Sequence, residues 1–153
     1  MSKNNLHHLS MILAYLEIGK ISAKANTELK NTSEFQNAIA YQLFHAIELF
    51  YKYMLLKKGI TKKIHNLAIL EEEYEKKFPL PEYKLDHPFD FSNYESYNGE
   101  EEQIAQEHLE KFKPKFMDQH LRYPNNQNTG GYSYQIEACI FEDMEKKIIN
   151  LSK

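Results

Sequence analysis

The stretch SEFQNAIAYQLFHAIELFYKYMLLKKG, residues 33–59, decides the fold of this chain. Ser33 with Gln36 three residues later is typical of a capping box, in which both side chains satisfy backbone groups of a helix's first turn. Gly59 stands just after the last apolar residues, where glycine adopts a left-handed backbone at little cost. Apolar residues between these signals recur at steps of three and four and form two adjacent rows, namely Phe35, Ile39, Leu43, Ala46, Ile47, Phe50 and Met54 beside Phe44, Tyr51 and Leu55. Because a helix with so wide an apolar surface is buried on several sides, we expect it to be the central helix of a bundle.

One narrow face of this helix is polar. It carries Tyr41, His45, Glu48 and Lys52, whose steps of four, three and four place them above one another on a helix. One interpretation is a solvated helix edge with a Glu–Lys pair worth about 0.2–0.5 kcal/mol. The other is a polar seam inside or between bundles, where His45 and Glu48 need partners because an unpaired buried polar group costs about 1–3 kcal/mol.

The rest of the chain predicts further helices and no strands. We expect helices over residues 6–30, from 61–65 to Phe78, from 100–102 to 112, and from about Ser133 to the end, with a short helical turn after Pro114. The last helix is expected to bury Ile136, Cys139, Ile140, Met144, Ile148 and Leu151. Residues 79–99 contain three prolines and five aromatic rings and predict a long irregular loop that lies across the bundle or binds a partner. The fold class is therefore all-α, an antiparallel bundle of about five helices in a single domain over residues 1–153.

Composition narrows the setting. A length of 153 residues and 42% apolar content suit one folded domain, and a net charge of −3 gives no overall nucleic-acid signature. One cysteine excludes an internal disulfide and fits a reducing compartment, and no signal-peptide core or membrane-spanning run is present. We therefore expect a cytoplasmic protein that has no membrane partner.

Two basic features are candidates for anion binding. Arg122 is the only arginine among 19 basic residues, and its planar guanidinium binds phosphate or carboxylate in a bidentate way that an ammonium cannot. The second feature combines a lysine group with a histidine near the start of a helix: Lys57, Lys58, Lys62, Lys63 and His65. The alternatives are a chance surface arginine and ordinary solvation of a turn.

Taken together, these residues resemble the HEPN superfamily (higher eukaryotes and prokaryotes nucleotide-binding domains). The resemblance rests on motifs in order: His45 to Glu48 (HAIE) with Lys52, residues 54–59 (MLLKKG), His65 to Leu67 (HNL) with Leu70, and Arg122 to Pro124 (RYP) before a last helix that begins at a tyrosine. It implies a helical bundle, frequently a homodimer, that binds RNA, a nucleotide or a partner protein in a bacterial toxin–antitoxin or defence system. A nucleotidyltransferase-type antitoxin is one partner of this kind.

Catalytic HEPN members resemble one another in an arginine followed five to seven residues later by a histidine, and they cleave RNA without metal. Arg122 matches the arginine, with Tyr123 beside it, but residues 123–129 contain no histidine. We therefore expect a binding module without the usual ribonuclease motif. One alternative is a metal-independent ribonuclease toxin that uses Arg122 with a displaced histidine, His45 or His120. Another is an interaction scaffold that binds a protein through the 79–99 loop.

Metal and cofactor motifs are absent from the sequence. None of the seven histidines has a glutamate three residues before it, and neither HExxH nor GxGxxG nor GxSxG occurs. His45 and Glu48 could supply two metal ligands, but a structural hydrogen bond is the commoner role. We expect neither a metal ion nor a cofactor.

Overall fold

The computed structural model describes residues 3–89, 117–118, 121–122 and 135–153. This part of the chain is helical and contains no strand, which confirms the all-α prediction there. Its elements, in order, are α1 (Lys3–Lys24), the 3-10 turn η1 (Glu28–Asn31), α2 (Ser33–Lys57), α3 (Leu67–Lys77), the 3-10 turn η2 (Pro81–Tyr83) and α6 (Ala138–Leu151). The expected helix over residues 100–112 and the loop over residues 90–99 lie outside the described residues, so the predicted number of helices stays a prediction.

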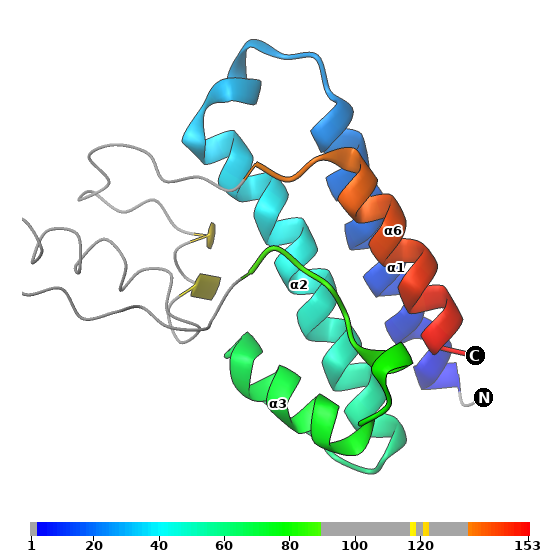
Figure 1. The fold of residues 1–153 in the computed structure, drawn as a ribbon. Coiled ribbons are helices and arrows are strands. Elements are labelled where there is room, and N and C mark those ends of the chain that lie inside the picture. Colours follow the sequence, from blue (N-terminus) through cyan, green and yellow to red (C-terminus); the bar gives the residue numbers. More distant parts are fainter. Residues whose placement is uncertain (1–2, 90–116, 119–120, 123–134) are drawn as a thin grey trace, which may run out of the picture.

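The helices pack around α2. Figure 1 shows α1 antiparallel to α2, α6 beside α1, and α3 crossing the C-terminal half of α2. Both ends of the chain lie at the same end of the bundle. In the described ranges, no helix is long and apolar enough to cross a lipid bilayer.

The core is centred on α2, as its two apolar rows predict. The side chains of Leu43, Phe44, Ile47 and Phe50 are fully buried. Twelve residues of this helix are buried in all: Ile39, Ala40, Leu43, Phe44, Ala46, Ile47, Glu48, Phe50, Tyr51, Tyr53, Met54 and Leu55. The one charged residue in this set is Glu48, which makes the polar face of α2 the unusual feature of the core.

The C-terminus of α2 ends as the sequence predicts. Gly59 has φ +75°, and its N–H donates to Leu56 O while the N–H of Ile60 donates to Leu55 O. This pair of bonds is a Schellman motif, which satisfies the last carbonyls of the helix.

The N-terminus of α2 is capped differently from the prediction. Thr32 is the N-cap, because its side chain accepts a hydrogen bond from the N–H of Phe35, whereas Ser33 is already helical. The side chain of Gln36 donates to Lys30 O and not to the cap. The predicted capping box at Ser33 is therefore wrong by one residue. Threonine and serine are both good N-cap residues, and here Thr32 has the extended backbone that an N-cap requires.

Three other helix limits differ. The first helix ends at Lys24, and α3 begins at Leu67 with Asn66 as its cap. The last helix begins at Ala138. Its Cys139 is exposed and does not lie on the inner face, which contradicts the prediction. Phe141 takes that inner place, and its ring lies where a Cβ on Gly19 would stand. The phase of α6 is otherwise as expected, since Met144 and Ile148 are buried.

The described part of the 79–99 loop lies against the bundle. Leu85 and Phe89 are buried, and the ring of Phe89 packs edge-on against Phe44 at 5.4 Å between centroids. The ring of Tyr83 contacts Phe78, so these aromatic residues serve the core. Residues 90–99 lie outside the described part, and the scaffold hypothesis for them stays untested.

Candidate functional site

The polar face of α2 is built around one buried carboxylate. Glu48 is only 1% exposed, and its Oε1 accepts hydrogen bonds from Lys52 Nζ at 2.6 Å and from His65 Nδ1 at 2.9 Å. His45 Nδ1 lies 3.7 Å from the other oxygen, Oε2, which is beyond good hydrogen-bonding distance. Of the two interpretations of this face, the polar seam with a buried Glu48 is the one the structure shows.

The charge of Glu48 is stabilised by its neighbours. Burial by itself raises the pKa of this carboxyl, but His45, Lys52 and His65 outweigh burial and lower the pKa to about 2. Glu48 is therefore ionised at neutral pH and holds its basic neighbours in place.

Three aromatic rings and the Arg122 guanidinium contact one another near the Glu48 carboxylate. The His45 ring stacks on Tyr41 at 5.4 Å and receives the edge of Tyr15 at 4.6 Å. The guanidinium carbon of Arg122 lies 5.8 Å from the centre of the Tyr41 ring. Burial raises the pKa of the Tyr41 hydroxyl, while Arg122 lowers it in part, so the hydroxyl keeps its proton at neutral pH.

Asp118 joins the same cluster, although no motif in the sequence points to it. It is 6% exposed, and its Oδ2 lies 3.5 Å from Arg122 Nη2. Ligand atoms of Asp118, Glu48 and His65 lie within 4.8 Å of one another. The available signal was the four-residue spacing from Asp118 to Arg122, which suits a helical ion pair. That spacing says nothing of Glu48, which is 70 residues away.

Two carboxylate oxygens in the cluster are buried without a hydrogen bond among the described residues. They are Glu48 Oε2 and Asp118 Oδ1. Since a buried acceptor without a partner costs about 1–3 kcal/mol, two in one place call for an explanation.

The structure separates the predicted lysine group. Lys57 Nζ donates to Ser152 O at 3.0 Å and lies over the Tyr53 ring, whereas Lys58 lies over the Phe78 ring. Lys62 pairs with Glu73 at 3.1 Å, and Lys63 is exposed. His65 belongs to the Glu48 cluster instead. Tyr123 and His120 lie outside the described residues.

A second, partly buried carboxylate ties the loop after α3 to the bundle. Glu71 Oε1 accepts a hydrogen bond from Tyr51 at 3.1 Å and lies 3.0 Å from His87 Nε2. Burial raises the pKa of Glu71, but His87 and Tyr51 outweigh burial and the pKa is lowered. No pattern in the sequence indicates this cluster, whose contacts between α2, α3 and the following loop indicate a structural role.

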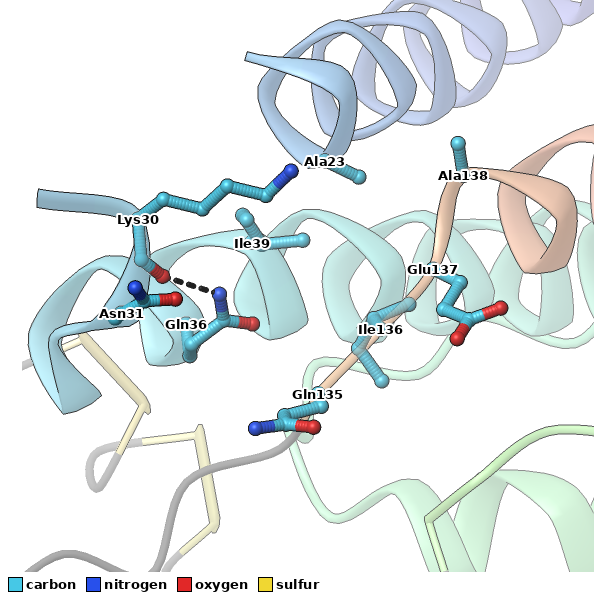
Figure 2. Close-up of a pocket in the computed structure, with 9 residues that line it drawn as sticks. All are labelled: Ala23, Lys30, Asn31, Gln36, Ile39, Gln135, Ile136, Glu137 and Ala138. Atoms are coloured by element: carbon cyan, nitrogen blue, oxygen red, sulfur yellow. Dashed lines mark hydrogen bonds between the residues drawn. The ribbon is translucent and has the colours of Figure 1, made fainter. Parts of the chain in front are cut away.

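A cavity of about 310 Å³ opens at the other end of α2. Figure 2 shows that η1, the first turn of α2 and the segment entering α6 supply its walls, with the Gln36 side chain bonded to the Lys30 carbonyl. Its lining is Ala23, Lys30, Asn31, Gln36, Ile39, Gln135, Ile136, Glu137 and Ala138. Amide groups dominate its polar part, and no residue of the Glu48 cluster lines it.

No protein-family model, curated protein or solved structure matches this chain. The chemistry of the site is therefore inferred from its own geometry and from the motifs in the sequence.

Proposed function

We propose that this chain is a HEPN-like helical module that binds single-stranded RNA, or a nucleotide, at the polar face of α2. The observation that carries the proposal is the position of Arg122 over the Tyr41 ring, next to His45. A guanidinium beside partly buried aromatic rings offers a phosphate contact and a stacking surface within a few ångströms of each other.

The buried carboxylate supports this role indirectly. Glu48 fixes Lys52 and His65 through hydrogen bonds, so two further nitrogen donors of this site are already ordered. Donors that are already ordered lose less conformational entropy when an anion binds.

Binding without cleavage is the primary form of the proposal, because residues 123–129 supply no histidine after Arg122. The resemblance to HEPN proteins extends the proposal to a homodimer in a bacterial toxin–antitoxin or defence system, with a cognate partner protein such as a nucleotidyltransferase-type antitoxin. Light scattering on a size-exclusion column tests the dimer, and a monomeric mass at high concentration would contradict that part.

The RNA-binding part is tested by fluorescence anisotropy with a labelled single-stranded RNA at several salt concentrations. Arg122→Ala is expected to weaken binding by roughly 10-fold or more, since a charge-assisted hydrogen bond contributes about 1.5–3 kcal/mol. Tyr41→Ala is expected to weaken binding similarly through lost stacking, whereas Tyr41→Phe retains the ring and the affinity.

Lys76→Ala is the matched control. It also removes one positive charge, but Lys76 pairs with Glu72 on the exposed surface of α3. Equal RNA affinities for Arg122→Ala and Lys76→Ala would contradict binding at this face.

A second candidate function, a metal-independent ribonuclease, has one observation in its favour. Tyr41 contacts both the His45 ring and the Arg122 guanidinium, so a potential general base and a phosphate-binding cation lie at the same site. Incubation with total RNA in EDTA tests this candidate. Cleavage that His45→Ala and Arg122→Ala both abolish would replace the binding-only proposal, and intact RNA would reject the ribonuclease.

A further inference from the structure

We infer that Glu48, His65 and Asp118 form a binding site for a divalent transition-metal ion, for which Zn²⁺ is the probe. The inference does not rest on RNA binding. It begins from the donor set, two carboxylates and one imidazole, which come from three separate segments of the chain and have ligand atoms within 4.8 Å of one another. Such mixed oxygen and nitrogen sets are typical of zinc, and not of magnesium or calcium, which favour oxygen alone.

The unpartnered oxygens are the second observation. Lys52 and His65 both bond Oε1 of Glu48, and Arg122 lies against Oδ2 of Asp118, so one oxygen of each carboxylate already has a basic partner. The other oxygen of each, Oε2 and Oδ1, is buried and makes no hydrogen bond within the described ranges. A cation held by the two carboxylates would offer these oxygens a partner.

The geometry requires a small adjustment. Ligands around a tetrahedral ion with bonds of about 2.1 Å stand about 3.4 Å apart, so the three side chains must close inward by about 1 Å. His65 can make such a movement, because its side chain is 58% exposed and precedes the first turn of α3. With three protein ligands, the fourth position would be open to water or to an anion.

Lys52 is the basic residue that would compete with the metal ion for Glu48. Lys52 already compensates Glu48 at 2.6 Å, so a bound ion would weaken this ion pair and Lys52 would turn toward solvent. Removing the lysine charge should therefore leave zinc affinity unchanged or raise it. If the cluster only stabilised the fold, removal of Lys52 would be as harmful as removal of Glu48 or His65, and zinc affinity would not distinguish these residues.

The experiment is an isothermal titration of the metal-free full chain with ZnCl₂ at neutral pH. The ligand variants are Glu48→Gln, Asp118→Asn and His65→Ala, each of similar or smaller volume, and circular dichroism checks their helicity. Each is expected to weaken the zinc site by at least about 10-fold, since even residues that only support ligands contribute that much. Zn²⁺ should also raise the unfolding temperature of the unaltered chain more than that of the variants.

Three variants serve as controls. His7→Ala removes an exposed histidine on α1, and Glu142→Gln removes a surface carboxylate on α6 that pairs with Lys24. Both should keep the unaltered affinity, and Lys52→Gln should bind zinc at least as tightly. Absence of zinc binding, an unchanged affinity in any of the three ligand variants, or a loss of binding in Lys52→Gln would overturn the inference.

Discussion

At the scale of single residues, the approach of α1 to α6 depends on Gly19. The ring of Phe141 occupies the space that a Cβ at this position would need. Phe141 is fully buried, so its ring has little room to move away. A glycine inside a helix is unfavourable by itself, and here it is explained by this contact.

Gly19→Ala is expected to destabilise the protein by about 1–3 kcal/mol through overpacking. The same change at an open helical site would stabilise by about 1 kcal/mol. Urea unfolding of Gly19→Ala in the unaltered chain and in a Phe141→Leu background separates the two effects. The cost should shrink or change sign in the second background, and an equal cost in both would show that the ring is not the cause.

Glu71 gives a pH prediction at the same scale. Its pKa in the folded state is lowered below the ordinary value of 4.5, so its contribution to stability is fully present above that pH. That contribution is lost as the pH falls through the lower, folded-state value. Glu71→Gln should therefore be less stable at neutral pH by roughly 1–3 kcal/mol and should lose less stability than the unaltered chain on acidification below 4.5.

The neighbouring residue provides the control for this measurement. Glu72 is exposed and pairs with Lys76 at the surface, where solvent screens the interaction. Urea unfolding at several pH values should leave Glu72→Gln close to the unaltered chain. A similar loss in both variants would contradict the role of burial.

At the scale of elements, the start of α2 shows how two adjacent cap residues are distinguished. Thr32 accepts from the N–H of Phe35 and also donates to Leu29 O, which links η1 to α2. The Ser33 hydroxyl donates instead to the exposed side chain of Glu34. The two residues have similar chemistry, and the backbone angles of Thr32 decide which of them caps the helix.

Thr32→Ala should lower the free energy of unfolding by about 1 kcal/mol, the usual effect of losing an N-cap. Ser33→Ala should change it by less than about 0.5 kcal/mol, because surface substitutions away from caps have small effects. Chemical unfolding of the pair measures the difference directly. A larger loss for Ser33→Ala would restore the capping box that the sequence predicted.

At the scale of the whole molecule, the two ends of the chain complete one core. Ile12 and Leu16 of α1 are buried in the same cluster as Met144 and Ile148 of α6, although 113 residues separate the two helices. Figure 1 shows these helices side by side. The last helix is therefore part of the fold and not an appendage.

Ile148→Ala is expected to cost about 2–5 kcal/mol, because Ile148 is fully buried. The adjacent Ile149 is 37% exposed, so Ile149→Ala should cost about 1 kcal/mol or less. Thermal or urea unfolding compares the two changes, which are chemically identical. Equal costs would mean that α6 does not pack on the bundle in this register.

The sequence predicted the features that depend on neighbours along the chain. The extent of α2, its buried rows and its glycine terminus follow from periodicity and capping, which act over a few residues. The predicted inner face of the last helix is confirmed at Met144 and Ile148, but the placement of Cys139 there was wrong. Spacing along a helix does not decide whether a residue at the edge of its apolar face is covered, and only the packing of α6 on α1 shows that Phe141 is buried and Cys139 is not.

By itself, therefore, the sequence determined a helical chain with one long buried helix and one polar face on it, since helix formation is governed by local spacing. Only the tertiary structure decided which residues from other segments contact that face. His65, Asp118 and Arg122 are separated from Glu48 by 17 to 74 residues. They come together because burying the apolar surface of α2 brings their segments against it.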